Sequence, residues 1–514
     1  MEKIFTSKEM KAIEAMSNNE GVTYLRLMEN AGSAAYNVLR KQYEITSGRM
    51  TVLCGNGNNG GDGFVVARKF YDNGIDVAVV LVSGAPKTPE AISMYNRVCE
   101  RDITVIDFEK ESKSTYLAIS QCDVVVDAVY GTGFHGKLKE SIKELFTFVN
   151  NVGKRTFSLD VPSGMNADDV CVEETCIQPT GTIVFAAYKP AHKLGTTEQM
   201  CGELTLVDIG IDQNLYNSLP LSITVMSEEL VKGMLKKRSP VGNKGTFGKL
   251  LNIGGSFGMS GAAAMSTMSA LRSGVGIATL ATTERLAENL IPLLLESTML
   301  PLKENKAGTI SAENLDRILE TAEKYTAILV GCGMSNNDDT KEIVEALIKT
   351  QNKPLIIDAD GINVLCESIN ILKESKADVI LTPHIGEFAR LLGKTIEEVK
   401  NRRFGLARDF AAEHNVTLVL KDSTTLIATP DSKLLINSNA NSGLAKGGSG
   451  DVLAGIIASL CAQGYSAEKA AAVGVYIHMT AAANSAARLG EHSMLARDVI
   501  DDIAFAFKKI EAKE

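Results

Sequence analysis

The run NSGLAKGGSGD at residues 441–451 places one carboxylate, Asp451, at the end of a glycine-rich loop and directly before an apolar helical pattern at 452–462. The neighbouring glycines let the backbone approach an anion closely, and the amino end of the following helix favours negative charge. A carboxylate at this place can remove the proton of a substrate hydroxyl. The run therefore predicts phosphate chemistry with a built-in base.

A second glycine-rich loop, NGNNGGDG at 56–63, lies far earlier in the chain and follows an apolar strand pattern at 50–54. Its glycine spacing differs from the three-glycine fingerprint of a conventional dinucleotide-binding fold. Two glycine-rich loops of this kind on one chain indicate two active sites.

Polar groups end three predicted strands of the N-terminal half: Asn58, Asn59 and Asp62, then Asp127 with GTGFHG at 131–136, then Asp160 and Ser163. Each cluster alone is equally consistent with a turn. However, the carboxyl ends of parallel strands meet at one crevice, so three clusters together favour a site. An asparagine carbonyl with Asp127 and Ser163 offers hard oxygen donors, which suit an alkali or alkaline-earth cation better than zinc. Asp160 is then the candidate acid/base.

The C-terminal half has polar strand ends of its own, in GCG at 331–333, DADGIN at 358–363 and TPHIGE at 382–387. A single histidine is usually structural, but His384 stands among other strand ends and is better placed than average to contact a ligand. Lys421 follows an apolar strand, and the hydroxyls of residues 423–425 follow Lys421. This segment could bind the phosphates of a nucleotide, with a solvated β-turn as the alternative. With Asp451 it makes a kinase-like set, although a Walker A sequence is missing.

The elements that must position these residues form two α/β series. Short β-branched runs alternate with helical stretches from Gly48 to about Ile211, a pattern typical of a largely parallel sheet. A second series begins after a weakly patterned linker at 210–242 and closes with alanine-rich helices. The predicted fold class is therefore α/β with two domains, at 1–220 and 221–514.

The bulk composition favours an ordinary globular enzyme. Lys+Arg 53 against Asp+Glu 62 gives a net charge of -9, which opposes nonspecific binding to nucleic acid or to an anionic membrane. The sequence contains no apolar run of the ~20 residues that a spanning helix needs and no signal-peptide pattern, so we expect a cytoplasmic location. The nine cysteines are scattered without metal-ligand spacing, which predicts reduced thiols rather than disulfides or zinc.

Three motifs in the N-terminal half, NNGGDG at 58–63, DAVYGTGFHG at 127–136 and DVPSG at 160–164, resemble the NAD(P)H-hydrate epimerase domain. The resemblance implies a Rossmann-like three-layer sandwich that interconverts the R and S forms of hydrated NADH or NADPH beside a potassium ion. The positions matching the nucleotide site are Asn58, Asn59, Gly60, Gly61, Asp62, Gly131, Thr132, Gly133, Phe134, His135, Gly136 and Lys137. Those matching the potassium site are Asn59, Asp127 and Ser163, and Asp160 matches the residue that contacts the reacting ring.

Four motifs in the C-terminal half, at 244–263, 358–363, 381–388 and 441–456, resemble the ribokinase-like superfamily and, within it, the ADP-dependent NAD(P)H-hydrate dehydratases. Matching positions for the hydrated nucleotide are Ala262, Gly333, His384 and Asp451. Matching positions for the adenine nucleotide are Lys421, Asp422, Ser423, Thr424, Thr425 and Gly450. The resemblance implies that Asp451 deprotonates the ring hydroxyl, that ADP with magnesium phosphorylates it, and that phosphate then leaves. Ile385 replaces the second proline of the family's PHPGE motif.

The two resemblances cover nearly the whole chain and imply a bifunctional repair enzyme with NADHX or NADPHX and ADP as substrates. One alternative is a kinase of a small alcohol such as a vitamin precursor, because a glycine-rich loop and a base serve either reaction. Another is that the N-terminal half only senses a ligand or mediates oligomerisation. The epimerase-like half, with Asp160 beside a cation set, favours repair, and members of the family with this layout predict a homo-oligomer.

Overall fold

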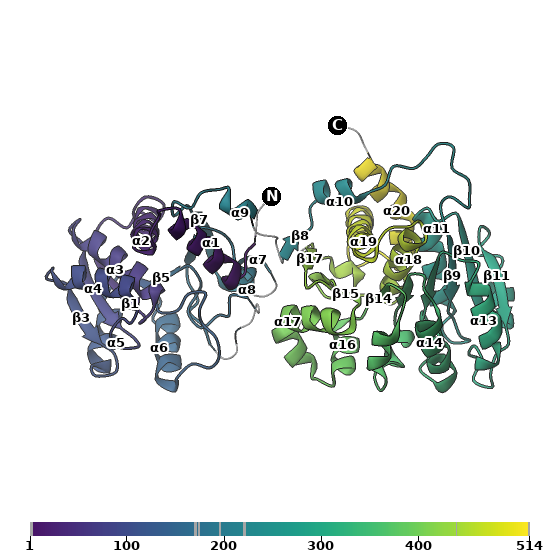
Figure 1. The fold of residues 1–514 in the computed structure, drawn as a ribbon. Coiled ribbons are helices and arrows are strands. Elements are labelled where there is room, and N and C mark those ends of the chain that lie inside the picture. Colours follow the sequence, from purple (N-terminus) through teal and green to yellow (C-terminus); the bar gives the residue numbers. More distant parts are fainter. Residues whose placement is uncertain are drawn as a thin grey trace. The chain divides into compact units, whose positions relative to one another are not determined.

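The computed structural model describes residues 4–168, 172, 175–194, 197–218, 223–437 and 439–511. The chain divides into two units, Met1–Ile223 and Thr224–Glu514 (Figure 1). The predicted boundary between residues 220 and 221 lies outside the described residues, in the segment 219–222.

The sheet of the N-terminal unit has seven strands in the order β3-β2-β1-β4-β5-β6-β7, all paired in parallel. Their bounds are β1 Arg49–Cys54, β2 Asp76–Leu81, β3 Thr104–Asp107, β4 Val124–Ala128, β5 Arg155–Leu159, β6 Gly181–Phe185 and β7 Glu203–Val207. The chain reverses its direction across the sheet between β1 and β4, where Cys54 pairs with Ala128. A ligand crevice is therefore expected at the carboxyl ends of these two strands.

Helices cover both faces of this sheet and bury its strands, as a parallel sheet requires. The helices are α1 Ser7–Asn19, α2 Tyr24–Lys41, α3 Asn58–Tyr71, α4 Pro89–Cys99, α5 Ser112–Gln121, α6 Glu140–Asn151, α7 Pro190–Lys193, α8 Thr197–Met200 and α9 Leu215–Ser218. Helices α2, α3 and α4 pack together with one set of strand side chains. Helices α5 and α6 pack against the other set, which gives three layers.

The sheet of the C-terminal unit has ten strands in the order β11-β10-β9-β12-β13-β14-β15-β16-β17-β8. Their bounds are β8 Ile223–Val225, β9 Lys249–Ile253, β10 Ile277–Thr283, β11 Thr298–Leu302, β12 Ala327–Val330, β13 Leu355–Ile357, β14 Val379–Leu381, β15 Thr417–Leu420, β16 Thr425–Ala428 and β17 Leu434–Asn437. Strands β9 to β15 pair in parallel, whereas β15, β16 and β17 pair antiparallel. The direction of the chain reverses between β9 and β12.

The helices of this unit are α10 Glu228–Met234, α11 Ser260–Arg272, α12 Glu284–Leu290, η1 Ala312–Asn314, α13 Leu315–Ala322, α14 Asp338–Thr350, α15 Asp360–Asn363, η2 Ile369–Glu374, α16 Ile385–Leu392, α17 Ile396–His414, η3 Ser442–Leu444, α18 Ser449–Ala462, α19 Ala467–Leu489 and α20 Ala496–Glu511. Helices α11, α18, α19 and α20 form one packed group over the sheet, seen around the yellow C-terminal helices in Figure 1. Small residues of α11 and α18 allow their close approach: a Cβ at Gly455 would lie 2.1 Å from Ser269 Oγ.

The predicted α/β fold class with two domains is confirmed, but both glycine-rich runs differ from the prediction. Helix α3 starts at Asn58, within the predicted loop, and α18 starts at Ser449 rather than at Val452. In both helices the N-cap is a glycine, so no N-cap side chain accepts a hydrogen bond from the first turn. Gly448 has a φ of +95°, a backbone conformation that other residues adopt at a cost, and this turn sets the start of α18.

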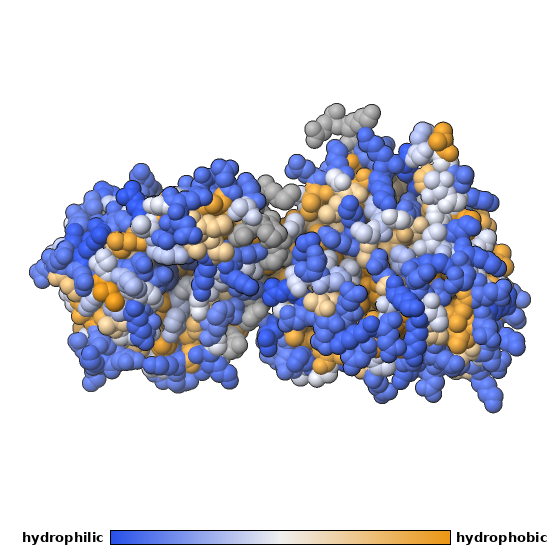
Figure 2. All heavy atoms as spheres, viewed as in Figure 1, coloured by the Kyte–Doolittle hydropathy of each residue, from blue (hydrophilic) through white to orange (hydrophobic). Residues whose placement is uncertain are grey.

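No helix in the described part of the chain is long and apolar enough to cross a membrane. Figure 2 shows hydrophilic residues over most of the visible face, with apolar residues as separate spots between them. The exposed large apolar side chains include Val241, Phe257, Leu293 and Leu295.

Candidate active sites

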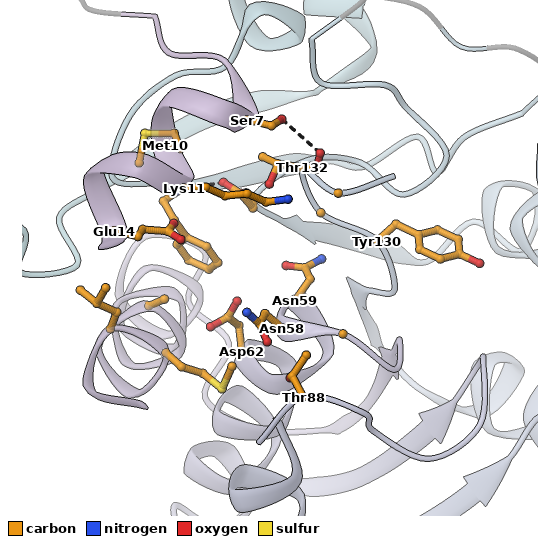
Figure 3. Close-up of a pocket in the computed structure, with 18 of the residues that line it drawn as sticks. Ser7, Met10, Lys11, Glu14, Asn58, Asn59, Asp62, Thr88, Tyr130 and Thr132 are labelled. Atoms are coloured by element: carbon orange, nitrogen blue, oxygen red, sulfur yellow. Dashed lines mark hydrogen bonds between the residues drawn. The ribbon is translucent and has the colours of Figure 1, made fainter. Parts of the chain in front are cut away.

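A cavity of about 500 Å³ opens at the carboxyl ends of β1 and β4, where the topology places a ligand crevice. Its volume is in the usual range for a small-molecule site. The lining includes Ser7, Met10, Lys11 and Glu14 of α1, Asn58, Asn59 and Asp62 of α3, Gly131 to Phe134, Asp160 and Lys189. Figure 3 shows Lys11, Glu14, Asn58 and Asp62 around this cavity.

Eight predicted site residues line the cavity: Asn58, Asn59, Asp62, Gly131, Thr132, Gly133, Phe134 and Asp160. Gly60 and Gly61 instead allow α3 to pack closely, since a Cβ at Gly60 would lie 2.0 Å from the Gly55 carbonyl oxygen. The lining does not include His135, Gly136 or Lys137, which continue the same loop. Asp127 and Ser163 are fully buried behind the lining.

Asp127 is a buried carboxyl group held by hydroxyl and amide donors. Its Oδ2 accepts from Ser158 Oγ at 2.8 Å and from Ser163 N at 2.9 Å, and its Oδ1 accepts from Ser163 Oγ at 2.5 Å. Burial raises the pKa of Asp127, and the hydrogen bonds from Ser163 and Ser158 oppose that rise. No ion pair joins Asp127 to a lysine, arginine or histidine within the described ranges. A cation would offset this buried negative charge.

The Asn59 side chain is buried beside the loop that follows β4, because a Cβ at Gly131 would lie 3.3 Å from Asn59 Cγ. Neither Oδ1 nor Nδ2 of Asn59 has a hydrogen-bond partner in the part of the chain that the structure describes. A buried amide without partners is costly and points to a missing ligand or water. An amide oxygen, a carboxylate and a hydroxyl therefore lie in one region, and this donor set fits a hard cation such as potassium.

Asp160 follows β5 directly and has a φ of +64°, an uncommon conformation for a residue other than glycine. Its backbone N–H donates to the Ile183 carbonyl at 2.8 Å. Its Oδ1 accepts a 2.5 Å hydrogen bond from Lys189 Nζ, which also donates to the Phe185 carbonyl at 2.9 Å. Lys189 is almost fully buried, so its charge acts on Asp160 with little screening by water.

The sequence prediction missed Lys189 and Glu14 as site residues. Lys189 had a usable signal, since it follows the strand pattern of β6 as the other polar groups follow their strands. Glu14 lies on α1, a part of the chain in which no site residue was predicted. The structure fixes α1 through Ser7, whose N–H donates to Asp168 Oδ1 at 2.8 Å and whose hydroxyl donates to the Thr132 carbonyl at 3.1 Å.

The C-terminal unit brings Cys332, Asp358 and Asp451 together, with one ligand atom from each within 4.8 Å of the others. Cys332 and Asp358 follow β12 and β13, and Asp451 lies in the first turn of α18. Burial and the neighbouring carboxylate of Asp358 raise the pKa of Asp451 to about 6. Asp451 is thus a carboxyl group whose pKa lies close to the pH at which a general base operates.

Lys421 contacts this cluster through Asp358. Its Nζ donates to Asp358 Oδ1 at 3.0 Å, and Thr382 Oγ1 donates to the same oxygen at 2.7 Å. Burial lowers the pKa of Lys421, but Asp358, Glu387 and Asp451 outweigh burial and the net shift is upward. A Cβ at Gly450 would lie 3.0 Å from Lys421 Nζ, so the lysine meets the start of α18.

His384 is the N-cap of α16, and its Nδ1 accepts from the N–H of Gly386 at 2.9 Å and of Glu387 at 3.3 Å. Nε2 of this half-exposed ring lies 3.5 Å from Glu387 Oε1. Burial lowers the pKa of His384, with Glu387 opposing the shift. His384 and Lys421 are paired at the ends of β14 and β15, so these two predicted residues lie side by side.

The remaining predicted residues of the C-terminal unit fall into two groups. Ala262 and Gly333 are neighbours, since a Cβ at Gly333 would lie 2.9 Å from Ala262 Cβ. In the turn from β15 to β16, Asp422 forms an ion pair with Arg403 at 2.7 Å. Ser423 is exposed, whereas Thr424 and Thr425 are mostly buried.

Two family models match the chain: YjeF-related protein N-terminus over residues 24–191 and NAD(P)H-hydrate dehydratase over residues 250–504. Two relatives are both named bifunctional NAD(P)H-hydrate repair enzyme. The relative from Moorella thermoacetica is 32% identical, over 99% of this chain and 97% of its own length. That from Escherichia coli is 33% identical, over 94% of this chain and 89% of its own.

A solved structure is similar to the C-terminal part: the ADP/ATP-dependent NAD(P)H-hydrate dehydratase from Bacillus subtilis, co-crystallized with ATP/Mg2+. It is 29% identical, covers 57% of this chain and 100% of its own chain, and has a TM-score of 0.49.

Fold and sites define a two-domain α/β enzyme in which each parallel sheet places a carboxyl group beside the amino end of a glycine-capped helix. The matches over nearly the full chain narrow this class. The chain belongs to the family of bifunctional NAD(P)H-hydrate repair enzymes, which confirms the family inferred from the motifs.

Proposed function

We propose that this protein repairs hydrated NADH and NADPH by two reactions on one chain. The N-terminal unit epimerises the R and S forms, and the C-terminal unit dehydrates the S form at the expense of ADP, giving NAD(P)H, AMP and phosphate. The observation that carries the proposal is the presence of two separate acid/base centres, Asp160 beside Lys189 and Asp451 beside Asp358. The match to repair enzymes over both units supports their pairing.

In the N-terminal unit, the reacting carbon of the hydrate adjoins the ring nitrogen, so water can leave through an iminium and return on the other face. Asp160, held by Lys189, is a carboxylate placed to assist this exchange of water. Asn59, Asp127 and Ser163 would hold potassium, which supplies positive charge next to the bound nucleotide. The glycine-containing loop from Gly131 to Phe134 forms one wall of the cavity.

In the C-terminal unit, Asp451 would take the proton of the ring hydroxyl as that oxygen attacks the terminal phosphoryl group of ADP. The amino end of α18 faces the transferred group with N–H donors that carry no side-chain cap. Lys421, at Gly450, adds a fixed positive charge. Asp358 and the phosphates of ADP are hard oxygen donors suited to magnesium, which would neutralise the charge of the phosphoryl group.

The kinase alternative shares every group of the C-terminal site, because phosphorylation is its first step as well. Full-length relatives named as repair enzymes and an N-terminal cavity with its own acid/base pair favour repair. The expected homo-oligomer and the cytoplasmic location remain predictions, and sedimentation velocity of the purified protein would test the first.

The test mixes purified protein with a mixture of R and S NADHX, magnesium and potassium, and adds either ADP or ATP. The return of dihydronicotinamide absorbance measures repair. Complete conversion of both epimers supports both activities, and the faster nucleotide identifies the donor. Conversion that stops at the S fraction leaves only the dehydratase. If NADH does not form while ADP or ATP is consumed with vitamin alcohols, the protein is a kinase.

A further inference from the structure

Two carboxyl groups, Asp62 and Asp160, line the cavity of the N-terminal unit and differ in their surroundings. Asp160, at the end of β5, has the ammonium group of Lys189 at 2.5 Å. Asp62, in the second turn of α3, forms no hydrogen bond or ion pair with any residue that the structure describes. The surroundings of Asp62 therefore favour its neutral form.

The neutral state of Asp62 has physical causes that the structure shows. Burial raises the pKa of Asp62 well above its usual value, and the like charges of Asp160 and Glu14 raise it further. Lys189 opposes this shift, but its ammonium group is bound to Asp160. The Asp62 side chain points into the cavity rather than to the protein interior (Figure 3).

Other ionisable groups surround this pair on two elements, α1 and α7. Glu14 and Lys11 come from α1, and the pKa of Glu14 is raised by burial while Lys189 and Lys11 oppose the shift. His192 of α7 lies behind Lys189 and accepts its backbone N–H at 3.0 Å. Burial lowers the pKa of His192 to about 3, so this ring stays neutral and adds no charge.

We propose that Asp62 is the proton donor of the epimerase reaction and that Asp160, positioned by Lys189, is the proton acceptor. This inference rests on the proposed epimerase function. It gives Asp62 a role in proton transfer, which nucleotide binding at the start of α3 alone would not require. The two carboxyl groups line one cavity from α3 and from the end of β5, and in this proposal the ring binds between them with one face toward each.

The step balances in protons and electrons. Asp62 gives its proton to the hydroxyl oxygen, the carbon–oxygen bond breaks, water leaves, and the electron pair of the ring nitrogen forms the iminium. Asp160 accepts a proton from the water that adds to the opposite face, while the new carbon–oxygen bond forms and the pair returns to nitrogen. The two carboxyl groups then serve the reverse direction with their roles exchanged, and no oxidant or reductant is required.

The test uses the full-length Asp62→Asn variant, in which the amide keeps the shape of the side chain but cannot donate an acidic proton. The interconversion of R and S NADHX is followed without ADP by chromatographic separation of the epimers. We expect a loss of about 10²-fold or more, the usual contribution of a general acid. The ADP-dependent dehydration of S-NADHX by the same sample should be unchanged, which controls for folding and concentration.

The pH profile distinguishes a proton donor from a structural carboxyl group. The wild-type epimerisation rate should fall at high pH as Asp62 loses its proton, and Asp62→Asn should lack this limb. Lys189 lowers the pKa of Asp62, so in Lys189→Met the high-pH limb should move to higher pH. Glu14→Gln leaves Asp62 unchanged, so this variant should lose less activity than Asp62→Asn.

A wild-type rate and pH profile in Asp62→Asn would overturn the assignment, as would a large loss in Glu14→Gln with normal activity in Asp62→Asn. Failure of the proposed function looks different, because the wild-type protein itself would then not interconvert the epimers.

Discussion

The two sites of this chain share their position on the sheet and differ in which carboxylate their lysine binds. Each lies where a glycine-capped helix, α3 or α18, starts at the carboxyl edge of a parallel sheet. In the N-terminal site the lysine binds the proposed catalytic carboxylate, Asp160. In the C-terminal site the lysine, Lys421, binds Asp358 instead, and Asp451 is left beside a like charge with a pKa of about 6. The ammonium group thus contacts the proposed catalytic carboxylate in one site and its neighbouring carboxylate in the other.

The largest effect should come from Asp451→Asn. Removing the base of the C-terminal site should lower the dehydratase rate by about 10²–10⁴-fold, the range for a general base. The ADP-binding constant, measured by calorimetry, should change little. The epimerisation rate of the same variant should be that of the wild type, and a loss of both activities would mean that the sites are not independent.

The reciprocal change, Asp160→Asn, should reduce epimerisation by up to about 10²–10⁴-fold on the same grounds. Asparagine tolerates the positive φ of this position, so the backbone should be retained. R-NADHX is the substrate that reports the loss, because its repair needs epimerisation, while S-NADHX should still be dehydrated at the wild-type rate. An epimerisation rate equal to that of the wild type would remove Asp160 from its role.

The contrast in lysine placement predicts a pH dependence. The pKa of Asp451 is raised, so the base form is lost as pH falls through about 6, and dehydratase kcat/KM should fall about tenfold per pH unit below that value. In Asp358→Asn the like charge is gone and Lys421 is released, and both changes favour ionised Asp451. The acid limb should then move to lower pH, whereas a limb that stays in place would assign it to another group.

The smallest effect on chemistry, and a clear one on stability, is expected at Gly60. A methyl group there would lie 2.0 Å from the Gly55 carbonyl oxygen, so Gly60→Ala should cost about 1–3 kcal/mol of unfolding free energy. Gly133→Ala is a matched control on the other wall of the cavity, because nothing lies within 4 Å of its added Cβ. Urea titration of both variants measures the difference, and equal midpoints would contradict the packing role of Gly60.

The polar residues at the strand ends could be predicted from the sequence, because their position follows from the topology of a parallel sheet. Asp127 lies near the end of β4, and Asp160 and Asp358 directly follow β5 and β13. Parallel strands bring their carboxyl ends together whatever the details of packing. The roles of single residues were harder to predict. The phosphate-binding role of Lys421 stays a prediction. Its contact with Asp358 reaches across β14 and depends on the registers of β13, β14 and β15, which no local pattern encodes.

Local sequence patterns also did not predict the short strands or the residues at which the helices start. No strand was predicted at β3, β8, β11 or β17. These strands are short or mixed in character and lie toward the sheet edges. The helix at Asn58 begins in a run of asparagine and glycine, residues of low helix propensity, because close packing against Gly55 and β4 favours the helix there. Glu14 entered the site only through the tertiary docking of α1.

The docking of α1 has a consequence for synthesis. Residues 4–7 pair with Tyr188, Asp168 and Thr132, segments that are made much later. During vectorial translation the growing N-terminal unit therefore lacks one wall of its cavity until about residue 190 has left the exit tunnel. Helix α1 is thus made well before the segments that hold it, and it reaches its native contacts only after they have been made.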